Sequence, residues 1–123
     1  MQLIKVINVR NILDGLADRD DIGTNLTYWM AKFMMATHGE YRFYVSEMQK
    51  IIDKYSHKEQ VGGEDTIRIP PEHLDDFQRE VRSLEEMDVE CPNIKFALSD
   101  IVDKVKLSMK QIYPLLDFID EDR

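Results

Sequence analysis

The stretch Y-W-M-A-K-F-M-M-A-T-H-G-E-Y-R-F-Y-V-S-E-M, residues 28–48, decides the fold that this sequence predicts. It contains the only tryptophan and four of the seven methionines. Its apolar side chains recur every three or four residues, and the same spacing continues on both sides of the stretch. The recurring residues are Leu26, Met30, Phe33, Thr37, Tyr41, Tyr44, Met48, Ile51 and Tyr55. Because an α-helix has about 3.6 residues per turn, this pattern predicts one long central helix over about residues 25–57 with a buried face.

A second set of residues, Met35, Gly39 and Phe43, lies on roughly the opposite face of the predicted helix. A face exposed to solvent usually carries charged side chains, and glycine in a helix interior costs about 1 kcal/mol relative to alanine. We therefore expect this face to be covered in the middle of the helix. The cover is another helix of the chain, a second copy or a different protein, so these three residues form a candidate partner interface.

The N-terminal region predicts a strand followed by a helix. The segment L-I-K-V-I, residues 3–7, is rich in β-branched residues and predicts a short strand. Asn8 follows this segment and is expected to cap a helix of about ten residues, because asparagine side chains accept hydrogen bonds from the free amides of a helix start.

Glycine and proline mark the boundaries in the second half of the chain. Residues 59–66 include two adjacent glycines and predict a loop or hairpin tip. Short strands near residues 66–69 and 87–96 are expected to form a small antiparallel β element. Between them, a helix begins at Pro71, where proline occupies the first turn without losing a hydrogen bond, and ends near Glu86.

The C-terminal region predicts short helical pieces. Residues 99–104 predict a helical turn, and Ser108 is expected to cap a terminal helix. Pro114 lies past the first turn of that helix and predicts a kink or a short start. The whole pattern predicts a single domain over residues 1–123 of the α+β class, predominantly α-helical, with about four helices.

Composition and charge narrow the class of function. The chain has 123 residues, of which 43% are hydrophobic and 33% charged, and this is typical of a soluble globular protein. The net charge of −8 lies entirely in residues 58–123, and a candidate acidic surface on the predicted third helix comprises Asp75, Asp76, Glu80, Glu85 and Glu86. Because nucleic-acid binding relies on Lys and Arg, direct nucleic-acid binding is disfavoured. An acidic surface instead complements a basic groove of another protein.

The sequence contains no recognisable catalytic, cofactor or metal motif. The three histidines lie on different predicted elements without the spacing of metal ligands. Cys91 lies between Glu90 and Pro92, and we interpret it as a small buried hydrophobic residue. No apolar run is long enough to span a membrane, and no secretion signal is recognised, so a cytoplasmic location is expected.

Five segments resemble a family of small tailed-bacteriophage proteins with no assigned biochemical function. They are N-V-R-N-I-L-D-G-L (8–16), Y-W-M-A-K-F (28–33), I-I-D-K-Y (51–55), I-P-P-E-H-L-D-D-F-Q-R-E-V-R-S-L (69–84) and V-E-C-P-N-I-K-F (89–96). The resemblance covers most of the chain. It implies an accessory or virion-associated role in the host cell and supplies no catalytic residues.

The leading hypothesis is therefore a non-enzymatic phage protein that acts through protein–protein contacts, with a host, defence or virion protein or with itself. A second hypothesis is an acidic inhibitor that mimics nucleic acid and occupies a basic groove of a host or defence protein. A third is an unrecognised enzyme, which would require Asp76 and Glu80 to converge with His73.

Overall fold

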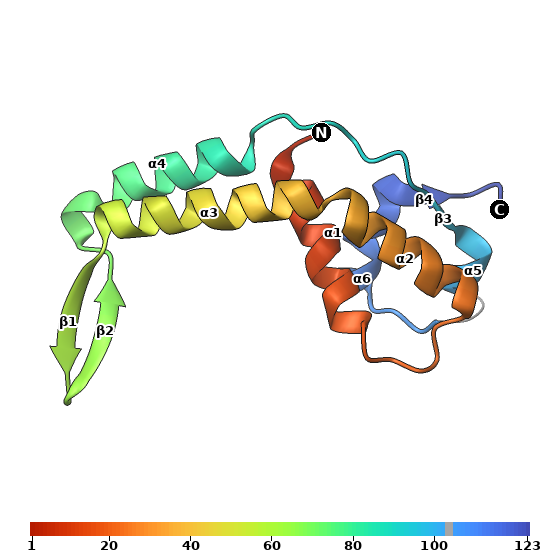
Figure 1. The fold of residues 1–123 in the computed structure, drawn as a ribbon, viewed down its shortest axis with the longest axis horizontal. Coiled ribbons are helices and arrows are strands. Elements are labelled where there is room, and N and C mark those ends of the chain that lie inside the picture. The colour runs from red at the N-terminus through yellow and green to blue at the C-terminus, as the bar shows by residue number, and fades with distance from the viewer. Residues whose placement is uncertain (103–104) are drawn as a thin grey trace.

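A helical core and a long projecting arm make up the molecule (Figure 1). The structure, a computed structural model, describes residues 1–102 and 105–123. The core contains α1 (Leu3–Leu16), α2 (Thr24–Ala36), β3 (Phe96–Ala97), α5 (Leu98–Val102), α6 (Met109–Ile112), the 3-10 helix η2 (Tyr113–Phe118) and β4 (Ile119–Asp120). The arm contains α3 (His38–Tyr55), β1 (His57–Val61), β2 (Glu64–Arg68), the 3-10 turn η1 (Pro71–His73) and α4 (Leu74–Glu85).

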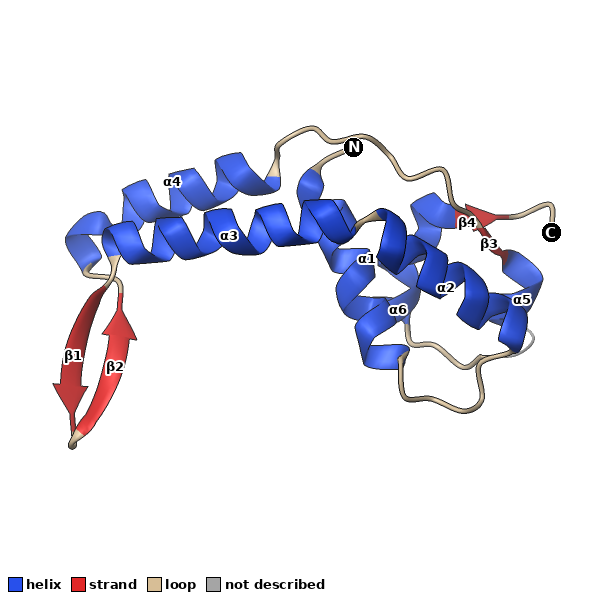
Figure 2. Cartoon of the chain, in the orientation of Figure 1, coloured by secondary structure: helices blue, strands red, loops and turns tan. Residues whose placement is uncertain are grey.

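The predicted α+β class is confirmed at the level of a mostly helical chain with a small antiparallel sheet (Figure 2). The described residues form six α-helices, so the prediction of about four is wrong. The strand predicted near residues 66–69 exists as β2, but its antiparallel partner is β1 and not the segment 87–96. That segment runs extended over the surface, with an isolated bridge at Asp88 and a parallel pairing of β3 with β4 at its end.

Helix α1 starts at Leu3, so the predicted strand over residues 3–7 and the predicted N-cap at Asn8 are both wrong. The apolar residues of α1 recur at helical spacing, and the following are buried: Leu3, Val6, Ile7, Val9, Leu13 and Leu16. Burial of this continuous face against the rest of the core overrides the β-propensity of the branched residues, because packing decides between the two conformations.

Three fully buried phenylalanines hold the core together. The ring of Phe33 on α2 lies 5.0 Å from the ring of Phe118 and 6.0 Å from that of Phe96, centroid to centroid. Together with Leu26 and Met30, which are also buried, Phe33 confirms the first half of the predicted apolar face. These contacts join α2 to β3 and to the C-terminal η2.

The arm is a single layer of two antiparallel helices. No residue of α3 is buried, and in α4 only Leu84 is. Tyr44, Met48 and Ile51 of α3 are half-buried and pack against the cluster that Leu84 forms with Leu3 and Ile7 of α1. The apolar side chains in the second half of the predicted central helix therefore pack against α4. Helix α1 packs against these two helices only where the arm meets the core.

Thr37 divides the predicted central helix, so the prediction of one helix over residues 25–57 is wrong. Its φ and ψ are −107° and 9°, between the end of α2 and the start of α3. The Thr37 hydroxyl donates to the carbonyl oxygen of Phe33 at 2.7 Å and accepts from Arg10 Nη1 at 2.8 Å. The same Nη1 donates to the carbonyl oxygen of Met34 at 2.7 Å. In a continuous helix, the amide of His38 would bond that carbonyl.

Arg10 is 7% exposed, and its guanidinium lies 4.6 Å from the centroid of the Tyr41 ring. Burial lowers the pKa of Arg10, while Tyr41, Asp14 and Glu40 oppose this shift. The charge is therefore held at the helix break by two hydrogen bonds and a cation–π contact, as favoured for cations at helix C-termini.

Local chemistry sets several other boundaries as predicted. Gly62 and Gly63 form the hairpin tip with φ values of 63° and 87°, which favour glycine. Ser108 caps α6 in a reciprocal capping box with Gln111, and Pro114 lies where α6 gives way to η2. The helical turn predicted over residues 99–104 matches α5, except that residues 103–104 lie outside the described residues.

Replacing Arg10 with methionine tests the role of the guanidinium at the break. Arg10→Met keeps an unbranched side chain but leaves the Met34 carbonyl and the Thr37 hydroxyl without their buried donor. We expect the free energy of unfolding, measured in urea, to fall by about 2–4 kcal/mol. Arg42→Met, at an exposed position of α3, is the control and should change it by less than about 0.5 kcal/mol. Equal stability of the two variants would contradict this role.

Candidate protein-binding surface

The structure places Met35, Gly39 and Phe43 at the surface, on both sides of the break at Thr37. Met35 on α2 is 76% exposed and Phe43 on α3 is 42% exposed. Gly39 is also exposed, and a Cβ atom built on it meets no atom within 4 Å. The described part of the chain therefore leaves this face open, and the covering layer expected in the middle of the helix is not supplied by the chain's own described helices.

Met35 belongs to a shallow hollow of about 570 Å³ on α2. Its lining residues are Tyr28, Trp29, Lys32, Met35, Ala36, Asn93 and Ile94. The rings of Tyr28 and Trp29 meet edge to face at 5.3 Å, and Lys32 Nζ lies 5.7 Å from the centroid of the Tyr28 ring. Lys32 is the only charged residue in this lining, so the hollow combines apolar walls with one positive charge.

Gly39 and Phe43 belong to a second shallow hollow, of about 210 Å³, beside the start of α3. The remaining lining residues are Leu3, Glu40, Met87 and Val89. Glu40 is the only charged residue here. The two hollows therefore share an apolar character and carry opposite charges.

The extended segment 87–94 borders both hollows, because its first residues line the hollow at α3 and its last residues line the hollow at α2. Figure 1 shows this segment passing from the end of α4 to β3. We call the two hollows together the docking surface. Its exposed members are Tyr28, Lys32, Met35, Ala36, Gly39, Phe43, Met87 and Asn93.

Sequence reasoning missed Tyr28, Lys32 and Met87. Tyr28 and Lys32 precede Met35 by seven and three residues, so they continue the same helical face, and this spacing was a usable signal. No comparable signal exists for Met87, because it reaches the docking surface from a distant segment of the chain.

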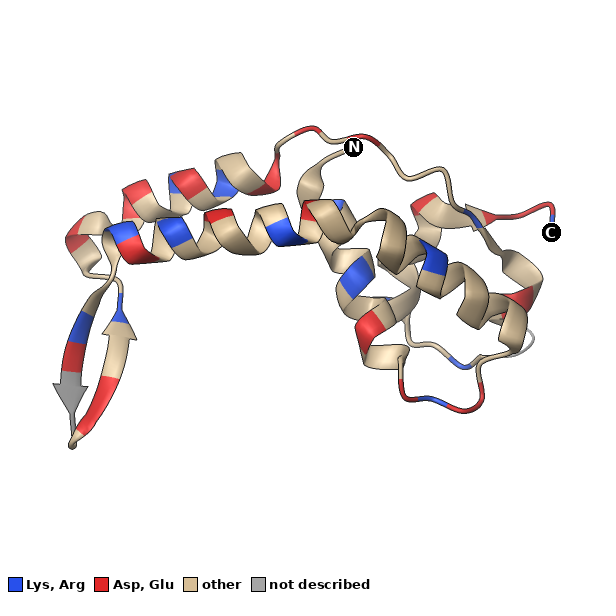
Figure 3. Ribbon diagram, viewed as in Figure 1, with Lys and Arg blue, Asp and Glu red and all other residues tan. Residues whose placement is uncertain are grey.

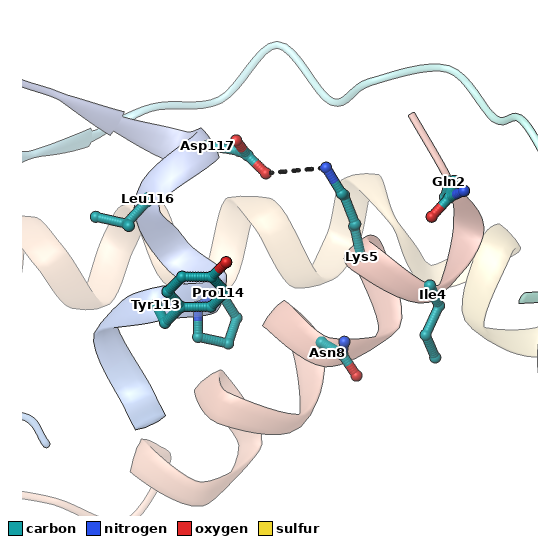
Figure 4. A pocket seen from close by; sticks show the side chains of 8 residues that line it. All are labelled: Gln2, Ile4, Lys5, Asn8, Tyr113, Pro114, Leu116 and Asp117. Atoms are coloured by element: carbon teal, nitrogen blue, oxygen red, sulfur yellow. Dashed lines mark ion pairs between the residues drawn. The ribbon is translucent and has the colours of Figure 1, made fainter. Parts of the chain in front are cut away.

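A third hollow, of about 400 Å³, lies between α1 and η2 (Figure 4). Gln2, Ile4, Lys5 and Asn8 line it from the first residues of the chain, and Tyr113, Pro114, Leu116 and Asp117 line it from the other side. Lys5 Nζ lies 3.7 Å from Asp117 Oδ2, so its two charges neutralise each other. This hollow therefore has less charge with which to select a partner than the docking surface has.

The candidate acidic residues lie on α4 and at its end, but they do not form a uniform acidic face (Figure 3). Asp76 pairs with Arg79 at 3.3 Å, and Glu80 pairs with Lys54 of α3 at 3.1 Å. Asp75, Glu85 and Glu86 make no ion pair with the described residues. The Tyr55 hydroxyl, and next Lys54, hold the pKa of Glu80 below its ordinary value. Basic side chains therefore neutralise part of this surface.

The residues that the enzyme hypothesis requires lie in η1 and α4: His73 ends η1, and Asp76 and Glu80 follow in α4. No group of three His, Cys, Asp or Glu side chains in residues 1–102 and 105–123 is placed to hold a metal ion. Asp76 and Glu80 are engaged in the ion pairs above, and the His73 ring lies 6.0 Å from the Tyr55 ring. Cys91 is exposed, so the prediction that it is buried is wrong. The reason is that the segment 87–96 runs over the surface at Cys91 and enters the core only at its last residue, Phe96.

None of the helices in the described ranges combines the length and the hydrophobicity needed to cross a bilayer. No family model, curated protein or solved structure matches this chain. The docking surface is therefore interpreted from its own geometry and chemistry.

The lowered pKa of Glu80 predicts a pH-dependent stability. Because the pKa is lower in the folded than in the unfolded chain, ionised Glu80 stabilises the fold above its ordinary pKa of 4.5. This contribution is lost as the pH falls through the lowered value. We expect Glu80→Gln to reduce Tm at neutral pH and to leave it unchanged in strong acid. Glu86→Gln, at an exposed site without an ion pair among the described residues, should leave Tm nearly unchanged at both. A Glu80→Gln protein as stable as wild type at neutral pH would refute this prediction.

Proposed function

We propose that this protein is a non-enzymatic bacteriophage accessory or virion-associated protein that acts in the host cell by binding another protein through the docking surface. The resemblance of its sequence segments to small tailed-phage proteins supports the phage part of this proposal. The observation that supports binding of another protein is the exposure of Met35 and Phe43, which line two apolar hollows.

The composition of the docking surface supports contact with a protein. Tyrosine and methionine are enriched in the cores of protein interfaces, and methionine adapts its shape to different partners. Contiguous exposed apolar patches on soluble proteins often mark interaction sites. The opposite charges of Lys32 and Glu40 favour a partner segment that inserts apolar side chains into both hollows. That segment would place an acidic residue at Lys32 and a basic residue at Glu40.

The charge distribution favours a second candidate, an acidic inhibitor that occupies a basic groove of a host or defence protein. It is supported by the net charge of −8 in residues 58–123 and by Asp75, Glu85 and Glu86, which form no ion pair with the described residues. The ion pairs of Asp76 and Glu80 weaken this candidate, because they reduce the negative charge of the same surface.

Capture of partners from lysate of infected host cells tests the proposal. We expect the Met35→Asp/Phe43→Asp double variant to retain a specific partner at least about tenfold less than wild type, because two apolar anchors become charged. Met109→Asp is the matched control, since Met109 is 82% exposed on α6 and lies outside the docking surface. Circular dichroism should show that all three proteins are folded.

Retention of the partner by the double variant would contradict docking at this surface. Equal loss with Met109→Asp would also contradict it. If moderate salt elutes the partner and Asp75→Asn/Glu86→Gln weakens capture while the double variant does not, the acidic inhibitor is the better account.

A further inference from the structure

The β1–β2 hairpin stands alone at the end of the arm (Figure 1). Its register runs from His57 opposite Arg68 to Val61 opposite Glu64, and no third strand among the described residues pairs with it. All five residues of β2 are exposed. A two-stranded hairpin without a covering layer is only marginally stable in water, and a free strand edge is a template for another strand.

The register shows which backbone groups of β2 are free. The hairpin closes on the two-residue turn Gly62–Gly63, so Val61 and Glu64 form the first hydrogen-bonded pair of the ladder. Hydrogen-bonded and non-bonded pairs then alternate along an antiparallel ladder. The N–H and C=O groups of Glu64, Thr66 and Arg68 therefore face β1, whereas those of Asp65 and Ile67 point outward.

The free edge of β2 is complementary to itself. If two β2 strands pair in antiparallel fashion about Thr66, Glu64 of each copy lies opposite Arg68 of the other. The outward groups of Asp65 and Ile67 then bond each other across the two copies. Opposite charges and paired threonines are both favourable cross-strand neighbours. Glu64 has no ion pair within the described chain. Arg68 lies 3.6 Å from Glu59 of β1, but its side chain stays 57% exposed, so it can also meet Glu64 of the other copy.

The edge of β1 lacks this complementarity. Antiparallel pairing of two β1 strands about their central residue would place Glu59 directly opposite Glu59 of the other copy, and like charges in that position are destabilising. The opposite face of the β2 pairing adds an apolar contribution, because the two Ile67 side chains become diagonal neighbours. Ile67 is 64% exposed in the single chain.

We propose that two copies of this chain associate through the edges of β2 and form one antiparallel sheet of four strands in the order β1-β2-β2-β1. The two copies are related by a two-fold axis, so each uses the same surface patch in the contact, as in closed dimers. This association uses the tip of the arm and does not depend on the docking surface.

Sedimentation equilibrium of the full chain over a wide concentration range tests the proposal. We expect wild type to dimerise and Glu64→Arg to weaken dimerisation by at least about tenfold, because two attractive pairs become repulsive. Arg68→Glu should weaken it in the same way. An equimolar mixture of the two variants should dimerise again, because each reversed side chain then lies opposite the reversed side chain of the other variant.

Two further variants distinguish the contribution of backbone hydrogen bonds to dimerisation from the contribution of charge. Ile67→Pro removes an outward N–H that the hairpin itself does not use, and we expect it to weaken dimerisation also. Glu121→Arg makes the same charge change as Glu64→Arg at an exposed C-terminal residue and should leave dimerisation unchanged.

Three results would overturn the proposal: a wild-type monomer at every concentration, a dimer insensitive to Glu64→Arg, or a mixture of the two reversed variants that does not dimerise. Dissociation by Met35→Asp/Phe43→Asp without any effect of Glu64→Arg would also overturn it. That last result would instead support self-association through the docking surface, so failure here does not carry over to the proposed function.

Discussion

The buried guanidinium of Arg10, on α1, lies at the break between α2 and α3, where the core meets the arm. The end of a helix leaves carbonyl groups without donors, and a buried break requires a substitute for the missing amides. Arg10 supplies it from α1 by bonding the Met34 carbonyl and the Thr37 hydroxyl. The price of burying the charge is offset by these bonds and by the Tyr41 ring. The break separates α2, which packs in the core, from α3, which forms one side of the arm.

The arm is thin because α3 and α4 bury their apolar side chains mainly against each other. The cluster of Leu84 with Leu3 and Ile7, together with the contact of Arg10 with the Tyr41 ring, ties this layer to α1. Beyond that junction, the helices and the hairpin have solvent on most sides. The two proposed contact surfaces follow from this shape: the docking surface lies where the helix break and the segment 87–94 leave apolar hollows, and the β2 edge lies at the far tip.

Local charge arrangement matters more than net charge for both surfaces. The acidic half of the chain does not present a uniform field, because Asp76 and Glu80 are paired with Arg79 and Lys54. In both proposals, the charges that would select a partner are those that border apolar surface or lie on a free strand edge. Lys32 carries one such charge, and Glu64 carries another.

The Gly62–Gly63 turn and the α6 start at Ser108 can be predicted from the sequence, because their hydrogen bonds close within a few residues. The helical conformation of most of residues 25–57 can also be predicted, from the three- and four-residue spacing of the apolar side chains. Residues 37–40, T-H-G-E, have the spacing of a capping box, but the Thr37 side chain makes no capping bond in the structure. Only the tertiary structure decided that the helix breaks there, because the Thr37 hydroxyl binds Arg10, 27 residues away. Packing likewise made residues 3–7 helical and left Cys91 exposed, since burial depends on distant partners that local patterns do not encode.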